Sequence, residues 1–166
     1  MGLERIASGT RVFIDAPVLV YHFTGLSVEC RSLLERCERG DVEGVTSVTV
    51  IAEVTHRLMM IEAVQAGLVS AGNVATKLQK KPEAIRKLHI ASEQAARIPV
   101  MGITVLGLDL RVVLAASELR RRHGLMTNDS IIAATLVDAD IEHLATGDRD
   151  FRRVKGVTVF EPSDLT

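Results

Sequence analysis

The chain has 166 residues, with 20 Lys and Arg against 21 Asp and Glu, which gives a formal net charge of −1. Hydrophobic residues make up 47 % of the chain, aromatic residues only 3 %, and there is no Trp. This composition excludes an intrinsically disordered chain and a polybasic nucleic-acid arm, and it disfavours base-stacking platforms. We expect one domain over residues 1–166, which would hold a polyanion through a local basic patch or metal ions.

The first half of the chain begins with short apolar runs and continues with long amphipathic ones. Strands are predicted over residues 11–15 and 43–46, and helices over residues 27–39, 47–67, 70–80 and 82–98. Pro82 suits the first turn of the last of these helices, and Pro99 would stop it. The stretch from about 47 to 98 contains no predicted strand, so we expect a helical arm at one edge of the domain.

The second half alternates strands and helices more regularly. Strands are predicted over residues 102–106, 141–146 and 156–160, and helices over residues 110–123 and 129–138. Asp109 is placed to cap the first of these helices, Gly124 to end it, and Thr127 or Asn128 to cap the second. Strands alternating with helices predict an α/β fold with a mostly parallel central sheet of four to five strands.

The cysteines and the N-terminal residues indicate the cellular compartment in which the protein is expected to act. Cys30 and Cys37 lie about two helical turns apart, roughly 10 Å, which is too far for a disulfide. The first ten residues contain no apolar signal-peptide core, and no apolar run approaches the roughly 20 residues that span a membrane. We therefore expect buried thiols in a reducing, cytoplasmic protein that does not enter a membrane.

Acidic residues follow the predicted strands. Asp15 ends the first strand, Glu53 lies in the second turn of the helix after the second strand, and Asp148 follows the fourth strand. Asp129 begins the helix after the 124–128 loop. In open α/β sheets the ligand site lies beyond the carboxyl ends of the strands, so these acids are expected to converge.

Each acid alone is explained equally well as a turn residue or a helix N-terminal acid. Together they would repel one another, by about 3 kcal/mol for a pair some 5 Å apart at an effective dielectric near 20. A divalent cation removes that repulsion, and hard oxygen ligands without His or Cys suit Mg²⁺ or Mn²⁺. The sequence therefore predicts a metal site at this edge of the sheet.

Four segments carry a family resemblance over nearly the whole chain. They are Val12-Phe-Ile-Asp15, Ser47-Val-Thr-Val-Ile-Ala-Glu53, Thr127-Asn-Asp-Ser-Ile-Ile-Ala-Ala-Thr135 and Leu144-Ala-Thr-Gly-Asp-Arg-Asp-Phe151. In order, spacing and context the sequence resembles the PIN-domain nucleases, and within them the VapC-type toxin ribonucleases. The resemblance implies a three-layer PIN-like fold and an Mg²⁺- or Mn²⁺-dependent endoribonuclease whose products carry a 5′-phosphate and a 3′-hydroxyl.

The same resemblance implies roles for particular residues. It assigns the catalytic, metal-binding set to Asp15, Glu53, Asp129 and Asp148. Asp150 resembles an accessory metal-binding acid, and Thr146 a supporting hydroxyl. The sequence departs from the family at Ala16-Pro17, where a small hydroxyl residue and an Asn are usual, and this departure puts the efficiency of cleavage in doubt.

Basic residues beside the last acidic motif are the candidates for binding RNA. Arg149, Arg152 and Arg153 flank the expected metal ligands and could hold phosphates, or alternatively an acidic segment of an antitoxin. The resemblance also implies a cognate antitoxin. It further suggests a homodimer that pairs through the early helices, around residues 27–60.

Two other classes of function remain to be weighed. A stand-alone or non-catalytic PIN-like module that binds RNA or protein is the main alternative, and only Ala16-Pro17 favours it. Receiver domains and haloacid-dehalogenase-like phosphatases need a second acid close after the first, and Ala16 and Pro17 stand in those places. Manganese-dependent cleavage of RNA distinguishes the enzyme from the binding module.

Overall fold

The computed structural model describes residues 1–165 and is built around a five-stranded parallel sheet. The strands lie in the order β3-β2-β1-β4-β5. Their bounds are β1 Arg11–Ile14, β2 Glu43–Ser47, β3 Ile103–Leu106, β4 His143–Ala145 and β5 Thr158–Phe160. Ile14 of β1 pairs with Ala145 of β4, and Phe13 pairs with Val45 of β2. The predicted parallel α/β fold is confirmed.

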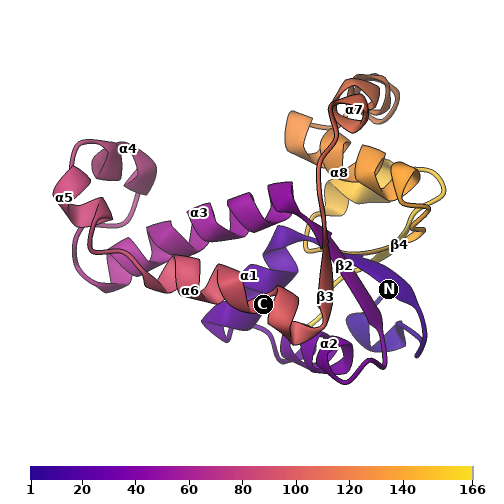
Figure 1. Cartoon of the computed structure of the whole chain (residues 1–166), viewed down its shortest axis with the longest axis horizontal. Helices are drawn as coiled ribbons and strands as arrows, with labels where there is room; N and C mark the ends of the chain where they lie inside the picture. Colours follow the sequence, from indigo (N-terminus) through magenta and orange to yellow (C-terminus); the bar gives the residue numbers. More distant parts are fainter. Residues whose placement is uncertain (166) are drawn as a thin grey trace.

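Helices cover both faces of the sheet (Figure 1). They are α1 Ala16–Thr24, α2 Val28–Glu38, α3 Val48–Gln65, α4 Val74–Gln79, α5 Pro82–Ile85, α6 Ile90–Arg97, α7 Leu110–His123 and α8 Thr127–Asp138. Short 3₁₀ helices span Leu3–Arg5, Pro99–Met101 and Arg149–Arg153. Because parallel crossovers are right-handed, the helices that connect β1, β2 and β3 lie on one face, and α7 and α8 lie on the other.

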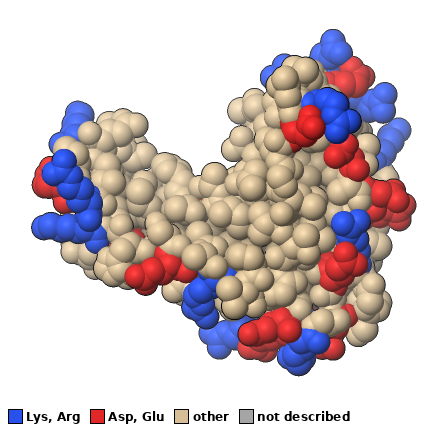
Figure 2. Space-filling view, in the orientation of Figure 1, with Lys and Arg blue, Asp and Glu red and all other residues tan. Residues whose placement is uncertain are grey.

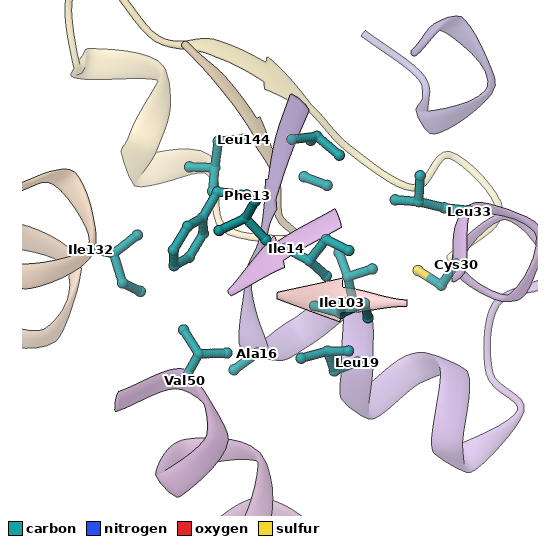
Figure 3. Packing of buried hydrophobic residues seen from close by; sticks show 14 of the residues in the cluster. Phe13, Ile14, Ala16, Leu19, Cys30, Leu33, Val50, Ile103, Ile132 and Leu144 are labelled. Carbon is teal, nitrogen blue, oxygen red and sulfur yellow. The ribbon is translucent and has the colours of Figure 1, made fainter. Parts of the chain in front are cut away.

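The core lies on both sides of β1, since successive side chains of a strand point to opposite faces. In Figure 3, Phe13 lies toward Ile132 of α8, whereas Leu33 of α2 lies on the other side of the sheet. A Cβ added to Gly44 would come within 3.2 Å of Ile14 and closer still to the Cys37 sulfur, so α2 packs tightly here. Cys37 is a buried free thiol, and the disulfide that the cysteine spacing excludes is absent among the described residues.

The arm departs most from the sequence prediction. A single helix over 82–98 is wrong, because the chain forms α5 and then starts again as α6 at Ile90. The carboxylate of Glu62, in α3, accepts hydrogen bonds from the backbone N–H groups of His89, Ile90 and Ala91 at 3.0, 3.2 and 3.1 Å. This side chain supplies the N-terminal cap of α6 and thereby fixes where that helix begins.

Two smaller differences concern helix starts. The sequence did not predict α1, which begins directly after Asp15 and carries Pro17 in its first turn. Proline is tolerated there because first-turn N–H groups have no partner within the helix. The backbone N-cap of α8 is Met126 rather than Thr127 or Asn128. Among the described residues, none of the helices is both long enough and apolar enough to cross a membrane.

Candidate active site

The candidate site lies where the strand order reverses, between β1 and β4. The chain leaves β1 toward one face of the sheet and leaves β4 toward the other, which opens a crevice at their carboxyl ends. Asp15 follows β1 directly, and its N–H donates to Ala145 O at 3.0 Å. Thr146 follows β4. The parallel register therefore places the Asp15 and Thr146 side chains next to each other.

Asp15 is a buried carboxyl group with a defined set of partners. It is only 4 % exposed, and its two oxygens accept from the Ala16 N–H at 2.7 Å and the Thr146 hydroxyl at 2.6 Å. Burial raises the pKa of Asp15 from 3.8 to about 6, although these two hydrogen bonds lower it. The negative charges of Glu53 and Asp129 raise the pKa further, so both acids lie within electrostatic reach of Asp15.

A chain of hydrogen bonds extends from Asp15 to the other acids that follow β4. The fully buried hydroxyl of Thr146 accepts from the Asp148 N–H at 2.9 Å. The Asp148 carboxylate accepts in turn from the Asp150 N–H at 2.8 Å, capping the 3₁₀ helix. A Cβ at Gly147 would lie 3.3 Å from Pro17, so the unusual Pro17 packs against this turn.

Asp129 lies in α8, in the connection between β3 and β4, and it is the next acid of the site. It lies in the first turn of α8 and is half-buried, and this burial raises its pKa. The negative charges of Asp148, Asp150 and Glu53 raise the pKa of Asp129 further. The structure therefore gathers all five acids predicted from the sequence into one electrostatic cluster, although they come from four separate segments of the chain.

Two arginines neutralise part of this cluster. Arg57 lies one turn after Glu53 in α3, and its guanidinium is 2.7 Å from the Glu53 carboxylate. Arg153 forms an ion pair with Asp150. Arg57 was not among the residues predicted for the site, yet an acid followed four residues later by a base is a recognisable helical ion-pair signal.

The donor set fits a divalent cation in its chemistry. It consists of carboxylate oxygens, which Mg²⁺ and Mn²⁺ prefer, and burial together with the neighbouring negative charges raises the pKa of Asp15 and of Asp129. Within residues 1–165, no three acidic, His or Cys side chains are arranged as a complete set of metal ligands. Glu53 and Asp150 are held by arginines instead.

The three arginines expected to bind RNA lie in different environments. Arg149 is exposed, at the start of the 3₁₀ helix that Asp148 caps. Arg152 is paired with Glu161, which raises the pKa of this arginine and lowers that of Glu161. Arg153 is paired with Asp150 and also donates to Gly124 O at 3.1 Å. Arg152 and Arg153 would have to release these partners to bind a phosphate.

An apolar groove of about 510 Å³ runs beside the site along α3. Its lining is Val20, Arg57, Met60, Ile61, Val64, Gln65 and Val74. Arg57 therefore belongs both to the groove and, through Glu53, to the acidic cluster. Figure 2 shows the molecule hollowed between the arm and the α7–α8 pair, with few charged side chains over the hollow.

Comparison with known families now decides what kind of domain this is. The model of the PIN domain family matches residues 12–157, which include all five acids. The chain belongs to the PIN domain family. Two ribonucleases of Methanocaldococcus jannaschii are similar to this PIN domain. VapC2 is 26 % identical, and the matched region covers 91 % of this chain and 93 % of VapC2. VapC6 is 24 % identical, and the matched region covers 93 % of this chain and 99 % of VapC6.

Solved structures share the fold. The VapBC2 structure from Rickettsia felis, bound to a promoter DNA fragment, has a TM-score of 0.58 at 16 % identity, covering 92 % of this chain and 98 % of that one. Mycobacterium tuberculosis VapC20, a toxin that cleaves the sarcin-ricin loop, has a TM-score of 0.58 at 16 % identity. The match covers 85 % of this chain and 92 % of that one. The resemblance stated from the sequence is confirmed, and this PIN domain has the fold of those toxins.

Proposed function

We propose that this PIN domain is a metal-dependent endoribonuclease of the VapC toxin type, which hydrolyses RNA phosphodiester bonds with Mg²⁺ or Mn²⁺. The observation that carries this proposal is the buried Asp15 carboxyl, whose pKa is raised to about 6 beside Glu53 and Asp129. Burial is the main cause of this raised pKa and the negative charges of Glu53 and Asp129 add to it, and a bound cation would offset both effects. The similarity to VapC2 and VapC6 along nearly the full chain supports the same function.

In this proposal each acid of the site has a different role in binding the metal ion or activating water. Asp15 and Asp148 would hold the ion directly, Asp129 would complete the ligand set, and Glu53 would act through water or as a base. When bound, Mg²⁺ or Mn²⁺ would activate water and neutralise charge on the phosphate. Thr146 orients Asp15 by donating to one of its oxygens, which leaves the carboxylate fixed in one direction. Arg149, which is exposed, would hold a phosphate of the substrate.

Cleavage of a generic RNA tests the assignment. We expect turnover with Mn²⁺, none with a chelator, and a loss of about 10³-fold in rate for Asp15→Asn. Asp41→Asn is the matched control, because Asp41 precedes β2 at the opposite edge of the sheet and pairs only with Arg39 among the described ion pairs. Metal-dependent RNA binding without cleavage would instead identify the non-catalytic module.

We further propose that a cognate antitoxin binds this PIN domain, since similar structures are toxin–antitoxin complexes. The groove along α3 suits an antitoxin segment with apolar side chains and a carboxylate that pairs with Arg57. Co-expression with the product of any small reading frame found next to this gene tests this. We expect a complex that Val64→Glu disrupts and that Val100→Glu, an exposed site far from the groove, leaves intact.

A further inference from the structure

The tip of the helical arm, residues 67–89, carries a concentration of positive charge. Its basic residues are Lys77, Lys80, Lys81, Arg86 and Lys87. Glu83 is the only acid in this range, so five basic residues against one acid give the tip a formal charge of +4, whereas the whole chain has −1. Figure 2 shows a group of basic side chains at this end of the arm, across the hollow from α7 and α8. The balanced charge of the chain therefore includes one strongly basic end.

The basic side chains of the tip have no acidic partners. Among the ion pairs of residues 1–165, none joins a basic residue of the tip to Asp or Glu. Arginines near the acidic site differ in this respect, since Arg57 and Arg153 are both paired. Glu62 of α3 lies within the arm, but it is buried and its oxygens accept from the start of α6. The charge of the tip is therefore left for a ligand to neutralise.

A small hydrophobic cluster holds the tip at the end of α3. Leu78 of α4 and Ala84 of α5 are buried with Ala63 of α3 and with Val69, which lies between α3 and α4. This cluster is separate from the main core under the sheet. The two short helices therefore have a defined place on α3, and so do the charges that they carry.

Two of the five basic residues have structural partners. Lys77 Nζ donates to Ser70 O at 3.1 Å and to Ser70 Oγ at 2.8 Å. Lys81 Nζ donates to Leu68 O at 3.2 Å. These lysines hold the loop between α3 and α4, and they use carbonyl and hydroxyl oxygens to do so. The side chains of Lys77 and Lys81 are therefore part of the arm itself.

The other three, Lys80, Arg86 and Lys87, are exposed and have no hydrogen-bond partner for their side chains in the described part of the chain. We call these three residues the basic tip. Residues 67–89 contain no aromatic residue, and Ile85, at 38 %, is the only large apolar side chain of that range that is exposed. Protein interfaces have apolar and aromatic centres in which Lys is depleted, whereas Lys and Arg commonly bind phosphates. The composition of the surface therefore favours a nucleic-acid backbone over a protein.

Helix α3 sets the distance between the basic tip and the acidic site. Glu53 lies in the second turn of α3, and the helix ends at Gln65, about 18 Å further along at 1.5 Å per residue. Salt screens exposed charges beyond about 8 Å at physiological ionic strength, so the basic tip does not act on a phosphate held at the acids. Phosphates of a stacked strand lie roughly 3.4 Å apart, so the basic tip would contact one about five nucleotides away.

We propose that Lys80, Arg86 and Lys87 form a second binding site for the RNA backbone, remote from the acids. RNA long enough to reach both sites would be held at two places, whereas a short RNA would be held at one. Because RNA is the substrate only under the proposed function, this second site rests on that function. A remote contact is equally strong in the ground state and the transition state, so it lowers KM for long RNA and leaves kcat unchanged.

Salt-dependent binding tests the basic tip independently of cleavage. The probe is a fluorescein-labelled oligouridine of roughly 24 nucleotides, measured by fluorescence anisotropy with a chelator present. The triple variant Lys80→Gln, Arg86→Gln, Lys87→Gln should bind about tenfold more weakly at about 0.1 M salt. The slope of log K against log salt concentration should become shallower by about 2, since each phosphate contact to a single strand contributes about 0.7.

Cleavage with Mn²⁺ tests the dependence on RNA length. The substrates are oligouridines of roughly 4 and 24 nucleotides, of which only the longer can span both sites. The triple variant should raise KM for the longer substrate about tenfold without changing kcat. Both constants for the shorter substrate should stay as in the wild type. A structural defect at the acids would instead lower kcat for both substrates.

Controls separate charge from position and from folding. The matched triple variant Arg5→Gln, Arg31→Gln, Arg39→Gln removes three charges from exposed positions on the first 3₁₀ helix and on α2 and its C-terminal cap. It should leave binding of the longer oligouridine nearly unchanged. Lys80→Arg with Lys87→Arg keeps the charge and should retain wild-type binding. Circular dichroism confirms that each variant is folded.

The possible outcomes distinguish this second site from the proposed function. Unchanged KM for the longer RNA, with cleavage intact, would overturn the second site and leave the enzyme standing. A chain that cleaves no RNA, but whose binding of the longer RNA depends on the basic tip, would support the second site and contradict the enzyme. Failure of the wild type to bind RNA would overturn both.

Two further results would also overturn the second site. Equal losses in the two triple variants would mean that net charge alone governs binding. Normal RNA binding by the tip variant, together with loss of a co-expressed antitoxin, would assign the surface to a protein partner.

Discussion

Two carboxylates with little exposed surface, Asp15 at the sheet edge and Glu62 in the arm, have pKa values shifted in opposite directions. Glu62 is 7 % exposed, and burial raises its pKa, but hydrogen bonds from the backbone N–H groups of His89, Ala91 and Ile90 outweigh this and lower the pKa overall. Asp15 is 4 % exposed but lies much deeper below the protein surface than Glu62, and this burial raises its pKa to about 6.

The difference lies in how deeply each carboxylate is buried and in which groups surround it. Glu62 faces the N-terminus of α6, where free N–H groups and the helix dipole favour an anion. Asp15 faces Glu53 and Asp129, two further acids, and its hydrogen bonds do not compensate. A carboxylate such as Glu62, whose oxygens accept hydrogen bonds from three backbone N–H groups, stabilises the fold. A carboxylate whose charge the fold leaves uncompensated is a candidate ligand for a cation, as proposed for Asp15.

Removing the Glu62 carboxylate should have the largest effect on stability. Glu62→Ala deprives three N–H groups of a charged acceptor, so we expect a loss of about 2–4 kcal/mol in the free energy of unfolding. Hydrogen exchange should accelerate first in α6. Glu93→Ala, at an exposed position in the first turn of the same helix, serves as the control. Equal destabilisation by both variants would contradict a specific capping role for Glu62.

Asp15→Asn should have the opposite effect on the metal-free protein. A folded-state pKa of about 6 against 3.8 means that the native carboxyl keeps its proton while the unfolded one has released it. The contribution of Asp15 to stability therefore falls as the pH rises from about 4 to 6 and stays low above that. At pH 7.5, with chelator present, the variant should be more stable by up to about 3 kcal/mol.

Urea unfolding of wild type and variant across pH 4–8 measures this directly. The two curves should separate between pH 4 and 6 and run parallel above it, since all other groups titrate alike in both proteins. Added Mn²⁺ should stabilise the wild type and have less effect on Asp15→Asn. Parallel curves throughout would show that Asp15 carries no unfavourable charge in the native state.

The sheet-edge site was predictable from sequence because each of its residues depends on a local signal. Asp15 and Asp148 each follow a short apolar run, Glu53 lies in the second turn of α3, which begins directly after β2, and Asp129 lies in the first turn of α8. Because the strands are parallel, residues that follow their carboxyl ends lie at the same edge of the sheet, and this does not depend on how individual side chains pack. The start of α7 at Asp109 was predictable for a similar reason, since its cap lies within the helix's own sequence.

The arm was less predictable because its boundaries depend on distant residues. The start of α6 is set by Glu62, 27 residues before His89, and no pattern within residues 82–98 reveals that contact. The ion pairs of Arg152 and Arg153 likewise depend on side-chain positions that the sequence leaves open. Local signals therefore locate the acids and the Glu53–Arg57 pair, whereas the pairing of Arg152 with Glu161 is found only in the folded chain.

Arg57 offers the smallest and sharpest test, through its pairing with Glu53. Its guanidinium is 2.7 Å from Glu53 and 42 % exposed, so the pair adds little to stability but does neutralise one acid of the cluster. If the cluster is a cation site, Arg57→Gln should tighten Mn²⁺ binding about two- to threefold, by removing a competing positive charge. Isothermal titration calorimetry measures this change without reference to RNA cleavage.

The matched control is Arg97→Gln, which removes the same charge at the end of α6 and should leave Mn²⁺ affinity unchanged. Weaker Mn²⁺ binding by Arg57→Gln would mean that Arg57 holds Glu53 in position for the ion instead of competing with it. That result would contradict the competition described here. An equal gain in both variants would show a general effect of net charge, because no contact between Arg57 and Glu53 would then be needed to explain it.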